Sequence, residues 1–457
     1  MADEIGRTDR KLDMLDYIKN KKIGIWGWGV AGKSVANYMI AHQAKVSVFD
    51  SKQLPATEQA FRGTLLEFLE TQEYIFPSPG IDLRKYSNYR HKWLSELDLF
   101  AHEWHKPSIG ITGTIGKTSL THILTQLLTS TGKAIITGGN IGIGLLDLLR
   151  QQETTDCAVL ELSSYQLERS TIYAPTIAIL TNLYPNHLDR HGTIHDYFEA
   201  KYKLFAHQKD TQISIVPLEL NSEFRKKTKR AFIFFSDHAP TKAEIQTLLP
   251  DDVLYYIQEQ KNIICLSKQS HTLDTLLEKI PTLSYPTNWL IAVAVLRALG
   301  KNAAGIESLL QSSSILLPEH RGELVAIKNG REYYNDSKST IFESTLAAVE
   351  RLNDKPLILL LGGLSKGVDR TKRIPKLLGK VTFVACFGAE AQELFEACVK
   401  HGIPASCDAS LPAAFESAHK QARTGYRILF SPAGTSFDLF KNYQERGEAF
   451  CLLVKNI

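Results

Sequence analysis

The sequence predicts an α/β protein of three domains, and three observations point to this class. The chain has 457 residues, which corresponds to about three domains of ~150 residues each. Short apolar segments alternate with amphipathic ones, as in parallel sheets with crossover helices. Several apolar segments end in glycine-rich turns, which is where such sheets bind ligands.

The composition excludes several classes of protein. Hydrophobic residues make up 44% and charged residues 22%, which is typical of globular domains rather than of disordered or fibrous chains. The net charge of +4 is too small for a nucleic-acid footprint, so we expect no nucleic-acid partner. No apolar run reaches the ~18 residues of a membrane helix, and the charged start is unlike a secretory signal. We therefore expect no membrane partner.

The six cysteines are Cys157, Cys265, Cys386, Cys398, Cys407 and Cys451. None of them forms a Cys-x-x-Cys pair, and their spacing suggests neither a zinc knuckle nor a disulfide scaffold. We therefore expect a reduced, cytoplasmic protein and, more specifically, an enzyme, although composition does not say which one.

Residues 1–105 are predicted to form the first domain. The apolar run Lys22–Trp26 predicts a strand, a glycine cluster follows it, and Val35, Tyr38 and Met39 then share one face of a helix. Lys45–Asp50 predicts the next strand. Strand, helix and strand at this spacing indicate a parallel sheet.

The glycine cluster Gly27-Trp-Gly-Val-Ala-Gly32 matches the GxGxxG pattern after a strand, with Asp50 at the end of the next strand. This is similar to the dinucleotide fingerprint. Three interpretations remain open: NAD binding, a tight turn without a ligand, or binding of the pyrophosphate of another nucleotide, since the glycines recognise phosphate.

Residues 106–314 are predicted to form the central domain. Ser108–Thr112 predicts a buried strand, and the helix after it has apolar positions spaced i, i+3, i+4, i+7 and i+8: Leu120, Ile123, Leu124, Leu127 and Leu128. Further strands are expected at Ala158–Leu162, Ile177–Asn182, Ile213–Val216, Ala231–Phe235, Val253–Ile257 and Ile263–Leu266, and the order of the last four is not predictable. Trp289–Leu299 predicts a buried helix closed by Gly300.

The strongest single motif is Gly110-Ile-Thr-Gly-Thr-Ile-Gly-Lys-Thr118, between a predicted strand and an amphipathic helix. In a phosphate loop at this position, backbone N–H groups and the helix N-terminus bind the phosphates, Lys117 reaches the β- and γ-phosphates and Thr118 can hold Mg²⁺. The spacing departs from the strict Walker A pattern, because Ile111 stands where its first glycine is expected. The alternative is a glycine-rich turn with an incidental lysine.

Three more residues of this domain are candidates for a metal site. Glu161 ends an apolar strand and is placed to bind Mg²⁺ directly or through water, although a rim carboxylate or a helix cap is the simpler interpretation. His187 follows a strand and could be a metal ligand, but a lone histidine is more often structural. Lys201 lies in a predicted helix over Tyr197–Phe205, where its composition alone favours a surface lysine.

Residues 315–457 are predicted to form a third sheet domain, which begins near Leu316-Leu-Pro318. Strands are expected at Leu357–Leu361, Val381–Phe387 and Arg427–Phe430. Polar clusters lie at Glu319–Arg321, Asn335–Thr340, Gly362–Lys366 and Ser431–Ser436, several of them directly after strands. Such clusters suit a nucleotide or a carboxylate substrate.

In this order, the motifs make the chain similar to the Mur ligases of peptidoglycan synthesis, and most of all to their D-glutamate-adding branch. They are Gly110–Thr118, Gly138–Gly142, Glu161–Glu168, Asn182–Arg190, His320-Arg321, Asn335–Thr340, Gly362–Lys366 and Ser431–Gly447. The resemblance runs over nearly the whole chain. It implies a Rossmann-like N-terminal domain for a UDP substrate, a central domain of the phosphate-loop ATPase type and a Rossmann-like C-terminal domain.

The resemblance also implies roles for individual residues. ATP would be bound by Gly113, Thr114, Gly116, Lys117, Thr118, Asn288, Arg321 and Asp336, and the UDP substrate by Gly29, Val30, Ala31, Ser51, Lys52, Gly80 and Asn140. Two Mg²⁺ ions would be held by Thr118, Glu161, His187 and Lys201, the last as a carbamylated lysine. D-glutamate would be received by Lys338, Thr340, Lys366, Ser436, Phe437 and Tyr443. Catalysis would depend on Lys117, His187 and Lys201.

The activity that this resemblance implies is ATP-dependent joining of D-glutamate to UDP-N-acetylmuramoyl-L-alanine through an acyl phosphate, by a monomer. The sequence departs from the family pattern at Ile115, Ile291 and Ile341, each in place of an asparagine, and at Asn186, in place of an acidic residue. Three alternatives remain: another Mur or folylpolyglutamate-type ligase, a catalytically weak nucleotide-binding relative, and an NAD oxidoreductase based on Gly27–Gly32.

Overall fold

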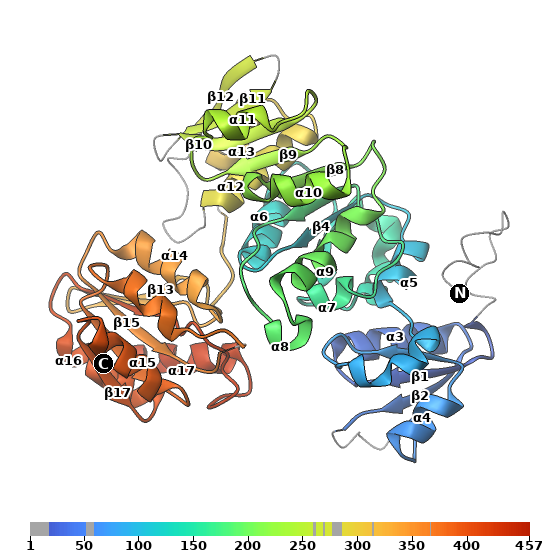
Figure 1. Cartoon of the computed structure of the whole chain (residues 1–457), viewed down its shortest axis with the longest axis horizontal. Coiled ribbons are helices and arrows are strands. Elements are labelled where there is room, and N and C mark those ends of the chain that lie inside the picture. Colours follow the sequence, from blue (N-terminus) through green and yellow to red (C-terminus); the bar gives the residue numbers. More distant parts are fainter. Residues whose placement is uncertain are drawn as a thin grey trace.

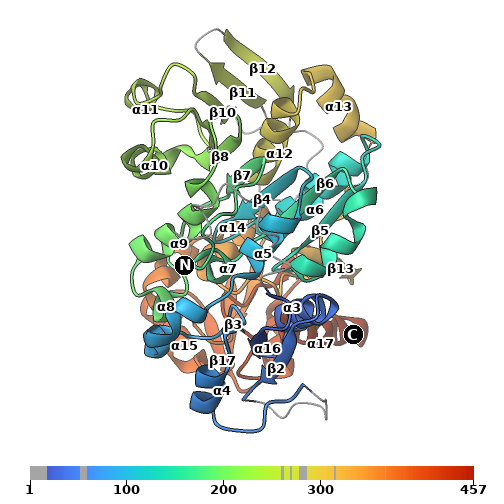
Figure 2. The same cartoon turned by 90° about the vertical axis from the view of Figure 1, so that its right-hand side faces the viewer.

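The chain folds into three α/β domains, each built around its own sheet (Figures 1 and 2). The computed structural model describes residues 18–51, 59–258, 262–267, 270–276, 286–312, 315–365 and 367–457. In both views the first and third domains lie against the lower end of the central domain. Within the described ranges, no helix combines the length and the apolar character needed to cross a membrane.

The strands are β1 (Lys22–Trp26), β2 (Lys45–Phe49), β3 (Tyr74–Pro77), β4 (Ser108–Thr112), β5 (Ile135–Gly139), β6 (Cys157–Glu161), β7 (Ile177–Leu180), β8 (Ile213–Pro217), β9 (Ile233–Ser236), β10 (Val253–Gln258), β11 (Asn262–Ser267), β12 (Ser270–Leu276), β13 (Glu323–Lys328), β14 (Arg331–Asn335), β15 (Leu357–Gly362), β16 (Phe383–Phe387), β17 (Ala405–Asp408) and β18 (Arg427–Phe430).

The α-helices are α3 (Val30–Ala41), α4 (Leu65–Thr71), α5 (Glu96–Glu103), α6 (Lys117–Thr129), α7 (Ser164–Leu167), α8 (Leu188–His191), α9 (Ile194–Ala206), α10 (Asn221–Lys227), α11 (Lys242–Gln246), α12 (Pro286–Ala298), α13 (Ala303–Ser312), α14 (Phe342–Leu352), α15 (Ala391–Lys400), α16 (Leu411–Gln421) and α17 (Tyr443–Lys455). Four 3₁₀ helices are η1 (Arg84–Lys92), η2 (Leu145–Thr154), η3 (Leu218–Leu220) and η4 (Thr371–Leu377).

The first domain has a parallel sheet in the order β2-β1-β3, with β1 at the centre. Helix α3 covers it, and its residues Val35, Tyr38 and Met39 are buried, as their shared helix face predicts. The loop before α3 requires glycine at position 32, because a Cβ there would lie 2.0 Å from Gly27 O.

The central sheet has the order β12-β11-β10-β9-β8-β7-β4-β6-β5. From β5 to β10 neighbouring strands are parallel, whereas β11 and β12 continue the sheet as an antiparallel edge. The four strands whose order the sequence left open therefore extend the same sheet in chain order. Of these, β9 begins at Ile233, two residues later than predicted.

Two apolar layers sandwich the central sheet. On one face α6 buries all five of its predicted apolar positions against the sheet and against α12. On the other face α9 contributes Phe198, Leu204 and Phe205 to a core that continues into the first domain through Leu97 and Phe100 of α5. The first and second domains thus share one hydrophobic core.

The third domain has the sheet order β13-β14-β18-β15-β16-β17, in which only the β13/β14 pair is antiparallel. The strand predicted at Val381–Phe387 begins at Phe383. Helix α17 crosses β13 and β14, while α15 and α16 lie along β16 and β17. The carboxyl ends of β14, β15 and β18 carry the polar clusters that the sequence singled out.

Buried polar contacts also join the first domain to the second. Glu96, at the start of α5, is buried, and its Oε1 accepts from the Leu145 N–H (3.0 Å). Asp98 accepts from Ser170 Oγ (2.8 Å) and from the Thr171 N–H (2.9 Å). Burial raises the pKa of Glu96 to about 8, although the Leu145 N–H lowers it in part. The junction therefore contains a carboxyl group that holds its proton more tightly than usual.

This shift predicts a pH-dependent junction. A carboxyl group whose pKa is raised from 4.5 to about 8 by folding binds its proton more tightly in the folded chain, so stability falls as pH rises through that interval. Glu96→Gln keeps an oxygen acceptor and does not ionise. We expect the variant to have a higher thermal midpoint than the wild type, by a difference that grows toward pH 8. The corresponding gain in the free energy of unfolding should reach at least ~1 kcal/mol. The exposed Glu70→Gln is the control, and equal behaviour of the two variants would contradict the shift.

Candidate functional site

The functional residues gather at the carboxyl end of the central sheet, where β4, β6 and β7 end side by side. The loop between β4 and α6 has left-handed backbone at Gly113 (φ 139°) and Gly116 (φ 85°). A Cβ at Gly113 would lie 1.9 Å from Thr181 Oγ1, so this position requires glycine. Gly116 directly precedes α6, so the N–H groups of the first helical turn lie beside the loop, as in anion-binding loops.

Side chains from two other elements hold this loop in shape. Asn182, after β7, accepts the Ile115 N–H (2.9 Å) and donates to Ile115 O (3.0 Å). Thr181 Oγ1 donates to the same oxygen (2.7 Å), and the buried Asn288 of α12 donates to Gly116 O (3.2 Å). Residue 115 therefore anchors the loop through its backbone, which an isoleucine supplies as well as an asparagine does.

Two lysine amines converge on one carbonyl oxygen of the loop. Lys117 Nζ donates to Gly113 O (2.9 Å) and to Thr114 O (3.1 Å). Lys201 Nζ, from α9, donates to the same Gly113 O (2.8 Å) and lies 4.4 Å from the ring centre of Tyr197. Lys201 is 1% exposed, and burial together with the charge of Lys117 holds its pKa well below the ordinary value of 10.5. Lys201 is therefore a buried amine that loses its proton more readily than a surface lysine, and the surface-lysine interpretation is wrong.

Glu161 ends β6 as a buried carboxylate with one unpaired oxygen. Its Oε1 accepts from Asn140 Nδ2 (2.8 Å), whereas Oε2 is buried and receives no hydrogen bond from the part of the chain that the structure describes. Such an oxygen is destabilising unless a cation satisfies it. Carboxylate and hydroxyl oxygens are the ligands that Mg²⁺ prefers. Glu161 and the nearby Thr118 therefore fit a Mg²⁺ ion. Asn140, placed by the resemblance in the UDP-substrate channel, orients this carboxylate.

His187 directly precedes the short helix α8, in the left-handed conformation (φ 56°). Its Nδ1 lies 2.7 Å from the hydroxyl of Tyr165, which belongs to α7. This hydrogen bond fixes the orientation of the ring, as partners of metal-binding histidines do. The ring of Tyr197 contacts His187 and also lies over the Lys201 amine, so the two predicted metal ligands share one neighbour.

Helix α8 is also where the three domains meet. Arg84 of the first domain donates from Nη2 to Asp189 O (3.2 Å). From the other side, a Cβ built on Gly367 of the third domain would lie 3.2 Å from Asp189 N. Figure 1 shows α8 between the two lower lobes. A displacement of either outer domain would therefore change contacts two residues from His187.

The third domain brings charged groups to the same place. Arg321 is buried, and its Nη1 lies 4.0 Å from Asp336 Oδ1. Lys338 Nζ lies 5.2 Å from the ring centre of Tyr443. Burial lowers the pKa of Lys338 to about 8, and the Glu161 carboxylate opposes this effect. Glu161 and Lys338 thus interact electrostatically across the boundary between the central and third domains.

A cleft between the central and third domains lies beside the residues predicted for D-glutamate. It is lined by Pro185, Asn186, Thr340, Ile341, Phe342, Glu343, Ser365, Val368, Arg370, Arg373 and Ala433. Of the predicted set, Thr340 lines the cleft, Ser436 is buried nearby in the loop after β18, and Phe437 is 72% exposed. Lys366 lies outside the described residues.

The residues predicted for the UDP substrate lie at the carboxyl ends of the strands of the first sheet. Gly29, Val30, Ala31, Ser51 and Gly80 follow β1, β2 and β3, and Lys52 lies outside the described residues. Added Cβ atoms on Gly29 and Gly80 would meet nothing within 4 Å. Asp50 Oδ2 accepts the Trp28 N–H (2.7 Å), so this carboxylate shapes the glycine turn. Because Asp50 is used to shape the turn, we expect the turn to bind a pyrophosphate and do not expect Asp50 to contact the ribose of NAD.

The other departures from the family pattern have structural places as well. Ile291 is fully buried in the core between α12 and α6, and Ile341 lines the interdomain cleft. Asn186 accepts the His187 N–H at its Oδ1 (3.0 Å) and thus supports the backbone of that residue. Of the four departures, only Asn186 takes the place of a charged residue.

Sequence reasoning missed two tyrosines that contact the predicted metal residues. Tyr197 could have been found, because it lies four residues before Lys201 and therefore on the same helix face. Tyr165 could not, because its contact with His187 depends on how α7 packs against the segment after β7.

Comparison with known proteins identifies the family. The Mur ligase middle domain matches residues 111–295. The UDP-N-acetylmuramoylalanine–D-glutamate ligase of Desulfotalea psychrophila is 34% identical, over 93% of this chain and 94% of its own length. The chain belongs to the Mur ligase family. The ligase of the same name from Oenococcus oeni is 30% identical over 97% of this chain and 99% of its own length.

Solved structures of other Mur ligases have the same fold. The UDP-N-acetylmuramate–alanine ligase MurC of Thermotoga maritima aligns with a TM-score of 0.60 at 15% identity, covering 95% of this chain and 99% of its own. MurF ligase of the same organism, solved in complex with ADP, aligns with a TM-score of 0.59 at 16% identity and 97% coverage of both chains. The prediction of three α/β domains is confirmed.

The Tyr165–His187 contact predicts that Tyr165→Phe weakens metal binding without unfolding the chain. Loss of the hydrogen bond frees the imidazole to rotate, and such losses reduce metal affinity by about 10–100-fold. The affinity for Mn²⁺, an EPR-visible substitute for Mg²⁺, is measured with an ATP analogue present. Tyr89→Phe, in the first domain, serves as the matched control. Unchanged affinity in Tyr165→Phe would mean that His187 is not a ligand oriented by this tyrosine.

Proposed function

We propose that this enzyme is an ATP-dependent ligase that joins D-glutamate to the carboxylate of UDP-N-acetylmuramoyl-L-alanine in peptidoglycan synthesis. The observation that supports this best is the convergence of charged groups from two domains on one phosphate loop. Lys117, Lys201 and Glu161 come from the central domain, and Arg321 and Lys338 from the third. The pKa values of the three lysines are each influenced by charges within this set. Such a site can bind a triphosphate beside a carboxylate acceptor.

In the proposed reaction, the substrate carboxylate attacks the γ-phosphorus of ATP, the bond to the ADP oxygen breaks, and an acyl phosphate forms. The amine of D-glutamate then attacks the acyl carbon, phosphate leaves, and the amine nitrogen loses a proton. The first step brings one anion toward another. Lys117 and the N–H groups at the start of α6 reduce that repulsion.

Two Mg²⁺ ions, when bound, would neutralise further phosphate charge and polarise the γ-phosphate. Glu161 and Thr118 would hold one of them, and His187 and Lys201 the other. The unpaired oxygen of Glu161 and the oriented ring of His187 support this assignment.

For Lys201 we propose carbamylation. The neutral amine adds to CO₂, forming an N–C bond and releasing one proton, and the product is a carbamate anion. The low pKa of Lys201 supplies the neutral amine, and the neighbouring Lys117 supplies a positive charge that balances the product. The modified side chain would present carboxylate oxygens beside His187.

The third domain would deliver the amino acid. Lys338 and Thr340 would receive the carboxylates of D-glutamate. The position of Thr340 in the lining of the interdomain cleft supports this assignment. Contact of the first and third domains with α8 would couple both substrates to His187, and closure would exclude water from the acyl phosphate. We place the enzyme in the cytoplasm, acting as a monomer.

The reaction is tested by phosphate release. With UDP-N-acetylmuramoyl-L-alanine and ATP, we expect sustained release of phosphate only when D-glutamate is added, because the amine consumes the acyl phosphate. L-glutamate, D-alanine and a diamino acid are the matched controls. Release that ignores D-glutamate, or that prefers a diamino acid, would assign the chain to another ligase. ATP binding without any turnover would identify a non-catalytic relative.

Carbamylation predicts that activity depends on dissolved CO₂. Enzyme stripped of bicarbonate is expected to lose most of its activity and to regain it on bicarbonate addition, because the carbamate forms reversibly. Lys201→Ala should lower kcat by at least ~10²-fold and show no bicarbonate response. Lys203→Ala, on the same helix but partly exposed, should behave as the wild type. A wild-type rate indifferent to bicarbonate removal would argue against the modified lysine.

A further inference from the structure

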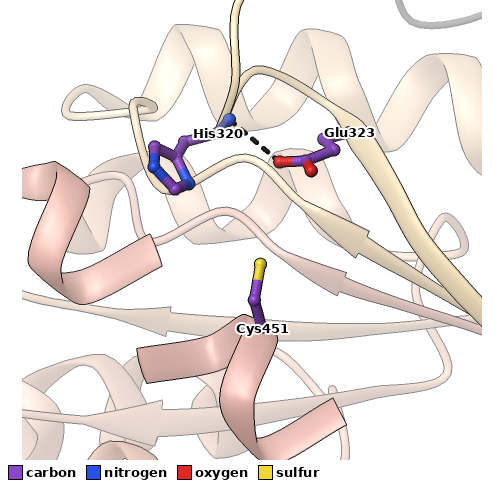
Figure 3. A group of neighbouring side chains, drawn as sticks. All are labelled: His320, Glu323 and Cys451. Carbon is purple, nitrogen blue, oxygen red and sulfur yellow. Dashed lines mark hydrogen bonds between the residues drawn. The ribbon is translucent and has the colours of Figure 1, made fainter. Parts of the chain in front are cut away.

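A second group of metal-ligating side chains lies in the third domain. It consists of His320, Glu323 and Cys451, whose ligand atoms all lie within 4.8 Å of one another (Figure 3). His320 is buried, and the other two are partly buried. The Glu323 carboxylate accepts the His320 N–H (3.1 Å), and Figure 3 shows Cys451 directing its sulfur toward the space between the other two side chains. The proposed ligase chemistry uses none of these three side chains.

One amide group currently satisfies the acceptors of this cluster. Asn335 Nδ2 donates to His320 Nδ1 (2.8 Å), to Cys451 Sγ (3.2 Å) and to Gly447 O (3.3 Å). An NH₂ group has only two hydrogens, so three acceptors share two donors. A nitrogen, a sulfur and an oxygen acceptor thus converge on one point, which favours a positively charged group there. The Glu323 carboxylate lies beside this point.

Backbone features hold the cluster together. Glu323 and Asn335 are direct partners in the antiparallel β13/β14 pair, so their side chains leave the same face of the sheet. Gly447 and Cys451 are four residues apart on α17 and face that sheet together. A Cβ at Gly447 would lie 2.4 Å from His320 Nδ1, so the helix can approach the imidazole only through a glycine. His320 itself adopts a left-handed conformation (φ 59°), which is strained for a residue with a Cβ.

We propose that His320, Glu323 and Cys451 form a binding site for a borderline-soft divalent cation of the Zn²⁺ class. Imidazole, thiolate and carboxylate are the zinc ligands of proteins, and a thiolate selects Zn²⁺ over Mg²⁺. Tetrahedral bonds of ~2.0–2.3 Å place ligand atoms about 3.3–3.8 Å apart, so the three side chains need to close by ~1 Å. The cation replaces the Asn335 amide as the positive group, and water or Gly447 O completes the coordination.

This site is distinct from the magnesium site of the central domain. Its ligands lie on β13, on α17 and in the turn before β13, all within the third domain. His320 directly precedes Arg321, and its carbonyl oxygen accepts the Lys338 N–H (3.1 Å). The cation would therefore lie beside residues of the proposed ligase site but would share no ligand with the magnesium site.

The test uses Co²⁺ as a spectroscopic probe for the full-length enzyme, with ADP and excess Mg²⁺ present to fill the magnesium site. We expect the wild type to bind one equivalent and to develop a thiolate-to-cobalt charge-transfer band, which Zn²⁺ then abolishes by displacement. Cys451→Ser should lose the band and weaken Zn²⁺ binding by at least ~10-fold, and Glu323→Gln should keep the band but bind more weakly. Cys407→Ser, an exposed cysteine of the same domain, should bind as the wild type.

Three results would overturn the proposal: no band in the wild type, a band that persists in Cys451→Ser, or equal weakening in Cys407→Ser. Circular dichroism and the thermal midpoint establish that each variant is folded. If Cys451→Ser does not fold, Glu323→Gln decides the question, because unchanged Zn²⁺ affinity in that variant excludes the site.

Discussion

The site depends on two buried amines that share one carbonyl oxygen. Lys117, at the start of α6, and Lys201, on α9, approach the same Gly113 oxygen, where little water can screen them. Two ammonium groups at such a position repel each other strongly, and burial further penalises their charge. Lys201, the deeper one, is therefore driven toward its neutral form. One arrangement therefore places a lysine at the start of α6 beside a second lysine whose pKa is well below its ordinary value.

The rest of the architecture positions partners for this pair. Glu161 reaches both lysines electrostatically, and its own orientation depends on Asn140, in the loop that follows β5. That loop leads to Gly144, where a Cβ would collide with Ser34 of the first domain. On the other side Lys338 enters from the third domain. The first and third domains are thus both linked to the loop between β4 and α6 through a few contacts of polar and charged side chains.

Much of the fold could be predicted, because local patterns report local structure. The apolar face of α6 and the strands β1, β4, β15 and β18 follow directly from spacing, and all of these strands except β18 end at or next to a glycine. The order of β8 to β11 in the sheet could not be predicted, because short strands of similar composition do not show which strands they pair with. Candidate site residues could be chosen mainly where motifs are contiguous in the chain, as in the glycine-rich loop between β4 and α6. Domain boundaries and substrate contacts remain predictions.

The type of fold, the family and the glycine-rich loop between β4 and α6 could be predicted from the sequence, because each depends on residues close together in the chain. The packing of distant segments is what buries Lys201 beside Lys117, sets Tyr165 against His187 and brings Cys451 near His320. These properties depend on which distant segments pack together and so keep water away from the side chains between them. No linear spacing encodes that exclusion, since a lysine or a cysteine has the same local pattern on a surface and in a core.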